Sequence, residues 1–171
     1  DRLRSRGLGD VYKRQVKAVL PQMRKQKRGR IICISSVAAV YSIPFQAYYS
    51  ASKAAINSFV DALTNEVKSF GIEVTSVMPG DISTGFTAAR IKSNAGDDVY
   101  SGVIGSAVSA MEKDEKNGMT PDSVARLVVK LAEKKHVAPL YTAGLQYKTL
   151  VFLSRLLPHK LAVKVVGGMY K

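Results

Sequence analysis

The segment Arg30-Ile31-Ile32-Cys33-Ile34-Ser35-Ser36 is an apolar run that ends in two hydroxyl side chains. Four consecutive apolar residues between Gly29 and the serines predict a short buried strand. A second strand is predicted from Ile72 to Met78, a segment rich in β-branched residues that is closed by Pro79-Gly80. Between the two segments, from about Tyr48 to Phe70, the apolar residues recur with helical spacing. This order predicts two parallel strands joined by a helical crossover.

Helical patterns also flank these runs. In the central helix the apolar positions share one face, and Gly71 is a natural stop; they are Ile56, Phe59, Val60, Leu63, Val67 and Phe70. An earlier helix is expected from Val16 to about Lys25, and Thr120-Pro121-Asp122 is a good start for a later one. The alternation predicts an α/β fold whose parallel sheet is covered by helices on both faces.

Composition is that of an ordinary globular protein, with 171 residues and 46% hydrophobic content, enough for one domain with a substantial core. Cys33 is the only cysteine and lies in an apolar run, so we expect a buried thiol, no intrachain disulfide and a reducing compartment such as the cytoplasm. His136 and His159 are isolated in the sequence, and we predict no metal site. No apolar run reaches the roughly 18 residues that span a bilayer.

Residues 1–15 are interpreted as foreign to the domain. Ser5 to Gln15 resembles the translation of a transposase-based sequencing-library adapter, eleven consecutive residues in one reading frame, and Asp1 to Arg4 fits the index region upstream. The competing interpretation is a basic amphipathic arm. We expect the natural sequence to start at Val16, and we exclude residues 1–15 from fold reasoning.

The chain is basic, with a formal net charge of +13. Residues 1–15 hold five basic and two acidic residues, so residues 16–171 hold 21 basic and 11 acidic ones, a net charge of +10. One basic cluster lies between Arg24 and Arg30, and the chain from Lys134 onward contains no Asp or Glu. No nucleic-acid reading motif accompanies this charge, so we expect a solvated helix end and no nucleic-acid partner.

Tyr49-Ser50-Ala51-Ser52-Lys53 carries the strongest chemical signal. A separation of four residues puts the phenol of Tyr49 and the ammonium of Lys53 on one helix face. A phenol has an ordinary pKa of about 10, and a nearby positive charge favours the phenolate and brings proton transfer toward neutral pH. Tyr48 fails this test because Ser52 lies four residues after it. The pair alone is a common pattern, so its neighbours matter.

Two further segments follow the predicted strands. Ser36 comes directly after the first strand, 13 residues before Tyr49, and Pro79-Gly80-Asp81-Ile82-Ser83-Thr84 follows the second. Open parallel sheets bind ligands at the carboxyl ends of their strands, so these groups are expected at one sheet edge. Each segment alone is consistent with a turn or a cap. The combination, in this order, is far more specific.

With these residues in place, the chain resembles the classical short-chain dehydrogenases/reductases from Val16 to about Thr142. The resemblance implies a Rossmann-like doubly wound parallel sheet and an NAD(P)-dependent oxidoreductase that interconverts a carbonyl and an alcohol. It implies that Tyr49 is the general acid/base, that Lys53 holds the ribose and lowers the tyrosine pKa, and that Ser36 hydrogen-bonds the substrate oxygen. The same resemblance assigns cofactor contacts to the segment that follows the second strand, at Pro79, Gly80, Ile82 and Thr84.

The family's other motifs are not found. Its first strands, its Gly-rich turn and the residue that selects NAD or NADP should precede Val16, and Gly7 and Gly9 are no substitute because they belong to the foreign stretch. The asparagine of the family's proton relay is expected about 27 residues before Ser36 and cannot be assigned. We therefore expect a truncated domain over residues 16–171 that is itself inactive, and the choice between NAD and NADP stays open.

The remaining segments bear on substrate and partners. Residues 85–116 resemble the family's variable substrate lid, in which Phe86, Ile91, Tyr100 and Val103 either line an apolar pocket or pack on the domain. The tail, 147–171, combines apolar and basic residues, a pattern typical of interfacial segments. Three arrangements of the tail are considered. It packs on the core of the domain, it packs on a partner subunit of a homo-oligomer, or it makes peripheral contact with a membrane surface. Contact with lipid would favour a lipid-like carbonyl or alcohol as the substrate.

Two classes of function remain open on the sequence. Ser36, Tyr49 and Lys53 favour an oxidoreductase, whereas the basic apolar tail is also compatible with a non-catalytic binding or scaffold protein that uses it for docking. The extended epimerase branch of the family shares Tyr-x-x-x-Lys, but the serine-to-tyrosine spacing and Pro79-Gly80 favour the classical branch.

Overall fold

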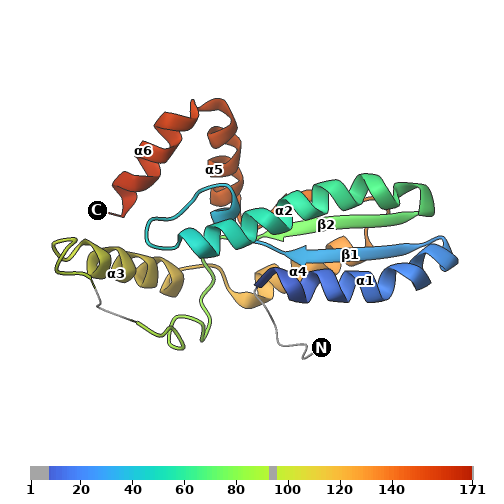
Figure 1. The fold of residues 1–171 in the computed structure, drawn as a ribbon, viewed down its shortest axis with the longest axis horizontal. Coiled ribbons are helices and arrows are strands. Elements are labelled where there is room, and N and C mark those ends of the chain that lie inside the picture. Colours follow the sequence, from blue (N-terminus) through green and yellow to red (C-terminus); the bar gives the residue numbers. More distant parts are fainter. Residues whose placement is uncertain (1–7, 93–95, 171) are drawn as a thin grey trace.

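The computed structural model describes residues 8–92 and 96–170, with side chains from residue 13 onward. Within that part, three parallel strands form a sheet in the order β1-β2-β3 (Figure 1). Strand β1 spans Gly29–Ile34, β2 spans Ile72–Met78, and β3 spans Leu140–Thr142. The register pairs Gly29 with Ile72 and Ile34 with Val77, so β1 and β2 end side by side. The predicted parallel α/β architecture is confirmed.

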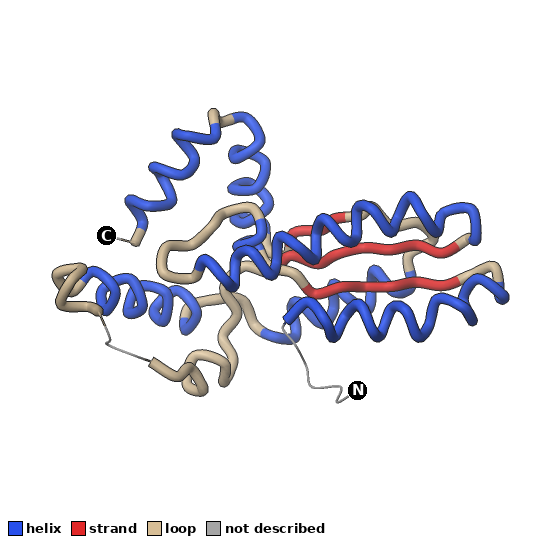
Figure 2. The backbone as a smooth tube through the Cα atoms, viewed as in Figure 1, coloured by secondary structure: helices blue, strands red, loops and turns tan. Residues whose placement is uncertain are grey.

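Helix α2, Ala47–Val67, is the crossover between β1 and β2 (Figure 2). It shares one core with α1, Leu8–Gln26, so both helices pack on the same face of the sheet. A short 3-10 helix, Lys68–Phe70, extends α2 to Gly71, whose φ of 67° is the left-handed conformation that ends a helix. Helix α4, Pro121–Glu133, covers the opposite face. Thr120 is its N-cap residue by position, although its side chain makes no capping hydrogen bond.

Alternation along the strands creates two cores. Val74 of β2 packs with Val60 of α2 on one face, whereas Val77 packs with Leu131 of α4 on the other, and all four side chains are at most 2% exposed. Burying an aliphatic side chain of this size contributes about 1.5–3 kcal/mol. The thiol of Cys33 is buried as expected, which raises its pKa. Both faces of the sheet are therefore covered, as the sequence predicts.

Helix α1 begins at Leu8, eight residues before the predicted start at Val16. Residues 8–15 are helical and add no strand to the sheet, and residues 1–7 lie outside the described residues. Lys13 to Gln15 are exposed, whereas Val16 is 6% exposed and is the first described side chain in the core. Val19, another apolar residue of the helix predicted from Val16 to about Lys25, is 41% exposed. The interpretation of residues 1–15 as foreign stays a prediction.

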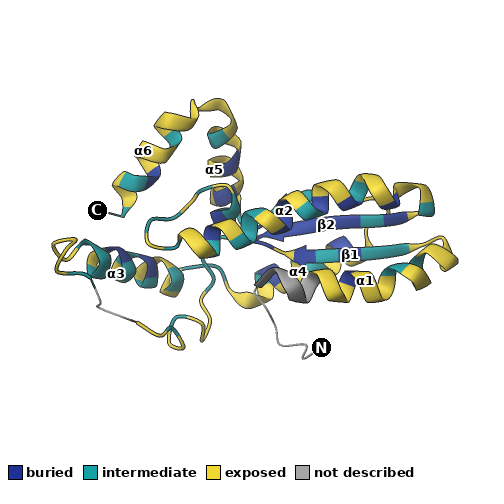
Figure 3. Ribbon diagram, viewed as in Figure 1, coloured by how far each residue is buried: buried dark blue, intermediate teal, exposed yellow. Residues whose placement is uncertain are grey.

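Three further helices lie beyond the sheet. Helix α3, Val103–Lys116, comes from the segment predicted to be a lid, and the tail forms α5, Leu145–Leu156, and α6, His159–Met169 (Figure 1). Pro158, the residue before α6, separates the two tail helices. Figure 3 shows long exposed stretches on both of them. In the described part of the chain, no helix has the length and apolar character needed to cross a membrane.

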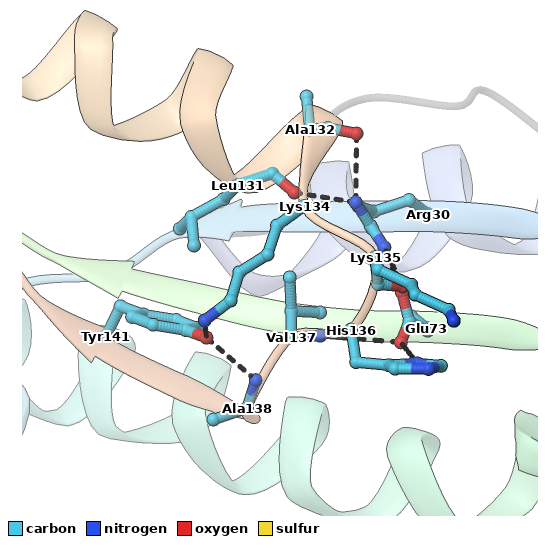
Figure 4. A network of polar contacts seen from close by, with 10 residues as sticks. All are labelled: Arg30, Glu73, Leu131, Ala132, Lys134, Lys135, His136, Val137, Ala138 and Tyr141. Carbon is cyan, nitrogen blue, oxygen red and sulfur yellow. Dashed lines mark hydrogen bonds and ion pairs between the residues drawn. The ribbon is translucent and has the colours of Figure 1, made fainter.

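A polar network holds the opposite end of the sheet (Figure 4). The guanidinium of Arg30 forms an ion pair with Glu73 on the neighbouring strand and donates to the carbonyls of Leu131 at 2.7 Å and Ala132 at 2.9 Å. His136 Nδ1 lies 3.1 Å from Glu73 Oε1. The sequence placed Arg30 in a solvated cluster and treated His136 as isolated. The expectation for Arg30 is wrong, because the fold brings Glu73 to its guanidinium across 43 residues. His136, isolated in the sequence, meets the same carboxylate across 63 residues and is a largely exposed side chain.

Candidate active site

A cavity of about 1100 Å³ lies at the edge of the sheet where β1 and β2 end. Ser36, the amino-terminal turns of α2 and the segment after β2 form its polar side. Helices α3, α5 and α6 supply a largely apolar side, which includes Ile104, Val108, Met111, Leu150, Leu153 and Val166. The predicted chemical groups and the lid and tail segments thus surround one space.

Tyr49 and Lys53 both line this cavity from the first two turns of α2. The Lys53 ammonium lies 5.7 Å from the centroid of the Tyr49 ring, and its Nζ donates to the carbonyl of Ile34 at 3.1 Å. Burial lowers the pKa of Lys53. Tyr48, which the spacing argument excludes, is 93% exposed.

Ser36 is 8% exposed and lies two residues after the end of β1. Its Oγ accepts a hydrogen bond from the amide of Ala38 at 3.1 Å and so caps a short 3-10 helix, Val37–Ala39. The amide of Val37 donates to the carbonyl of Pro79 at 2.9 Å. Ser35 Oγ donates to the carbonyl of Lys53 at 3.0 Å. These bonds fasten Ser36 between α2 and the segment after β2, and its own hydroxyl hydrogen can still be donated to a ligand.

Gly80, Ile82 and Thr84 also line the cavity, whereas Pro79 is buried behind it. Met119 fastens this segment from one side, because Ser83 N donates to its carbonyl at 2.9 Å and its own amide donates to the carbonyl of Asp81 at 2.8 Å. Every predicted site residue except Pro79 therefore borders the same cavity. The roles assigned to these residues stay predictions.

The sequence missed several residues of the apolar side. Of the four apolar residues named in the lid, Phe86 and Ile91 line the cavity, whereas Tyr100 and Val103 do not. Tyr100 instead packs edge-on against Phe45, with ring centroids 5.8 Å apart. The lining residues of α3 lie later in the same segment. Their helical spacing was the available signal.

Asp81 and Tyr147 also line the cavity, and neither was predicted as a site residue from the sequence. The Tyr147 hydroxyl donates to Asp81 Oδ2 at 2.7 Å, although 66 residues separate the two in sequence. Burial raises the pKa of Asp81, the hydrogen bond from Tyr147 opposes this, and the charges of Asp114 and Glu115 reinforce it. Nearby, burial and the charges of Asp81 and Asp114 raise the pKa of Tyr170 to about 12. Asp81 stood inside a quoted motif, but no local pattern links it to Tyr147.

The parallel sheet and its helical layers on both faces define a doubly wound α/β protein, with a tyrosine-lysine pair at the strand ends, where such sheets bind ligands. The family model for short chain dehydrogenase matches residues 12–95. The chain belongs to the short-chain dehydrogenase/reductase family.

The chain is similar to several known proteins of this family, each of which is about twice as long as the matched part. The chain is 43% identical over 122 residues to a 3-ketodihydrosphingosine reductase of Bacteroides thetaiotaomicron, covering 70% of this chain and 45% of that protein. It resembles the crystal structure of a short chain dehydrogenase from Burkholderia cenocepacia in complex with NADP (TM-score 0.66, 18% identity, 90% of this chain and 53% of that one). It also resembles one from Burkholderia phymatum in complex with NAD (TM-score 0.65, 21% identity, 83% and 52%). The chain spans about half the length of these proteins.

Proposed function

We propose that the protein is an NAD(P)-dependent oxidoreductase that interconverts a carbonyl and an alcohol. The observation that carries this proposal is the convergence of Ser36, Tyr49 and Lys53 on one cavity at the carboxyl edge of a parallel sheet. Ligands of open α/β sheets bind at that edge. The alternative of a non-catalytic docking protein has no comparable support in the site.

The residues present fit the nicotinamide and ribose end of a dinucleotide. The Lys53 ammonium has three donors, of which one goes to Ile34 within the described part of the chain, so two are available for ribose hydroxyls. Gly80, Ile82 and Thr84 border the same cavity and would hold the carboxamide end. The dinucleotide is NAD or NADP, and when bound it supplies or accepts the hydride.

The chain's own groups manage the proton. In the reductive direction the Tyr49 phenol donates its proton to the carbonyl oxygen, and in the oxidative direction the phenolate accepts a proton from the alcohol. The Lys53 ammonium lies 5.7 Å from the centroid of the Tyr49 ring and so keeps a positive charge beside the acid/base. Ser36 donates a hydrogen bond to the same substrate oxygen and so orients it toward Tyr49.

A lipid-like substrate suits the cavity. A volume of about 1100 Å³ is slightly larger than the roughly 300–1,000 Å³ found for small-molecule sites. Its apolar side reaches from α3 to α6, which suits a long alkyl chain whose oxidised carbon lies near Tyr49. The similarity to a reductase named for 3-ketodihydrosphingosine supports the same substrate class.

We further propose that the outer surface of α5 and α6 makes peripheral contact with an anionic membrane. Tyr147, Val151 and Val166 bury the inner side of these helices, whereas Phe152 and Leu156 are 63% and 66% exposed. Four basic residues accompany the exposed apolar ones, and no acidic residue occurs from Lys134 onward; the four are Lys148, Arg155, Lys160 and Lys164. Apolar area combined with positive charge is what anionic lipid surfaces attract. A second copy of the chain is the competing occupant.

The activity is tested with the full-length gene product. NADH and NADPH oxidation is followed with ketones of increasing chain length, and reduction of the oxidised dinucleotides with the matching alcohols. We expect turnover with one dinucleotide and a rise in kcat/KM with chain length. Failure to turn over any of these substrates, with either dinucleotide, would refute the proposal.

A further inference from the structure

Tyr147 of α5 occupies the space that a side chain at position 80 would need. A Cβ built on Gly80 would lie 2.1 Å from Tyr147 Cζ and 2.3 Å from two other ring atoms. The ring itself is buried, with 8% of it exposed. Glycine at position 80 is therefore what allows the tyrosine ring to rest against this backbone.

The hydroxyl of the same tyrosine makes two hydrogen bonds to the next residue. It donates to Asp81 Oδ2 at 2.7 Å and accepts from the backbone amide of Asp81 at 3.1 Å. Both bonds are partly buried, and a hydrogen bond to a carboxylate is stronger than one between neutral groups. One side chain from the tail thus holds both the backbone and the side chain of Asp81.

The opposite side of the segment is equally confined. Met119 exchanges backbone hydrogen bonds with Asp81 and Ser83, and a Cβ on Gly118 would lie 2.5 Å from the carbonyl of Asp81. The segment from Gly80 to Thr84 is therefore gripped between Met119 and Tyr147. Tyr147 lines the cavity itself and belongs to α5, whose Leu150 and Leu153 also line it.

We infer that Tyr147 is a positioning residue, which sets the backbone of residues 80–84 for the nicotinamide through its bonds to Asp81. This inference rests on the proposed function, in which that segment holds the carboxamide end. It adds a dependence on the tail, because displacing α5 removes the ring from Gly80 and both bonds from Asp81. The tail would then contribute to cofactor affinity through the position of this segment.

The test compares Tyr147→Phe with Tyr141→Phe in the full-length gene product. Tyr141 is the control because its hydroxyl also takes part in two hydrogen bonds, which it accepts from Lys134 Nζ and the amide of Ala138, both at 3.1 Å, and because it lies outside the cavity lining. Phenylalanine keeps the ring against Gly80 and removes only the hydroxyl. Thermal unfolding of both variants separates a general loss of stability from a local one.

Amide hydrogen exchange without cofactor is the first measurement. We expect exchange at Asp81, Ser83 and Met119 to become about 5-fold faster or more in Tyr147→Phe, the equivalent of one lost hydrogen bond, and to be unchanged in Tyr141→Phe. The second is kinetic. We expect the KM for the dinucleotide to rise about 5- to 30-fold with little change in kcat, the pattern of lost uniform binding.

A third variant, Asp81→Ala, distinguishes the effect of the hydrogen bond to the Asp81 carboxylate from the effect of the Tyr147 ring against Gly80. If Tyr147 acts through Asp81, the double variant should cost no more cofactor affinity than the more damaging single one. Equal exchange and equal dinucleotide KM in the two tyrosine variants would overturn the role of Tyr147 while leaving the oxidoreductase intact. A wild-type protein inactive with both dinucleotides would instead overturn the proposed function, and the role of this segment with it.

Discussion

The ammonium of Lys53 lies over the ring of Tyr49, 5.7 Å from its centroid, and is fastened by a hydrogen bond to the carbonyl of Ile34. One cation therefore links the end of β1 to the candidate acid/base one helical turn away. The contact uses the face of the ring, so a phenylalanine at position 49 would keep it. The phenol can thus be removed without removing the partner of Lys53.

Tyr49→Phe should lower turnover by about 10²-fold or more, the lower range of general acid-base contributions, and leave dinucleotide affinity nearly unchanged. Steady-state kinetics and a binding titration on the full-length gene product measure the two effects. Tyr48→Phe is the control, because Tyr48 is 93% exposed and has no lysine four residues on. Near-normal turnover in Tyr49→Phe would remove the proposed mechanism.

Lys53→Met should weaken dinucleotide binding and turnover together. Methionine approximates the length of the side chain but removes the donors to the ribose and the positive charge beside the Tyr49 ring. The same two assays apply, and the contrast with Tyr49→Phe is the informative part. A Lys53→Met variant with normal affinity and reduced turnover would show that Lys53 acts on the phenol alone.

Most of the secondary structure could be predicted from local sequence patterns. The strand from Ile72 to Met78 has the predicted bounds, and Gly71 ends the preceding helical segment as expected. Such elements depend on apolar spacing and stop residues within a short window. The sites at the strand ends could be placed for the same reason, since the strand order follows from the crossover connection.

Contacts between distant segments were not predictable in this way. The bonds of Tyr147 to Asp81 and of Arg30 to Glu73 join residues 66 and 43 positions apart, and polar residues with such partners look like ordinary surface or turn residues in the sequence. The start of α1 at Leu8 was excluded because of the origin assigned to residues 1–15, and not because their pattern opposes a helix.

Glu73→Gln should destabilise the protein by about 1 kcal/mol at neutral pH, the usual size of one hydrogen-bonded partner. Burial alone would raise the pKa of Glu73, but hydrogen bonds from Arg30 and His136 and the charge of Arg30 outweigh it and lower the pKa. A lowered pKa contributes stability above the ordinary glutamate value of about 4.3, and this contribution is lost as the pH falls through the folded-state pKa.

Denaturant unfolding of wild type and Glu73→Gln between neutral and acidic pH measures this contribution. The stability difference between the two should be largest at neutral pH and shrink at the acid end. Asp122→Asn is the control, because Asp122 is an exposed residue in the first turn of α4. A difference that stays constant across the range would mean that the network of Glu73 does not depend on its charge.

Val108→Phe should shorten the range of accepted substrates. Val108 lines the cavity from α3, so a larger side chain there occupies space proposed for the alkyl chain. We expect kcat/KM for the longest substrates to fall about 10-fold, consistent with the roughly 1–3 kcal/mol cost of added bulk. Short substrates should be unaffected, as should Val129→Phe, a control on the exposed side of α4. An equal fall in kcat/KM for short and long substrates would show that the alkyl chain of the substrate does not lie beside Val108.

Membrane contact through the tail should depend on charge and on apolar area separately. Replacing Lys160 and Lys164 by glutamine should weaken binding to vesicles that contain phosphatidylserine by about 30-fold, since each basic residue near an anionic surface contributes about 1 kcal/mol. Replacing Phe152 and Leu156 by glutamine should weaken binding even at low salt, because both side chains are mostly exposed in the free protein. Vesicle sedimentation gives the affinities, with Lys130→Gln on α4 as a control charge outside the tail. Phosphatidylcholine vesicles should bind weakly in every case. The membrane proposal is wrong if the wild-type protein binds neither type of vesicle and the Phe152 and Leu156 substitutions convert a dimer to a monomer in light scattering. In that case the exposed surface of α5 and α6 joins two copies of the protein.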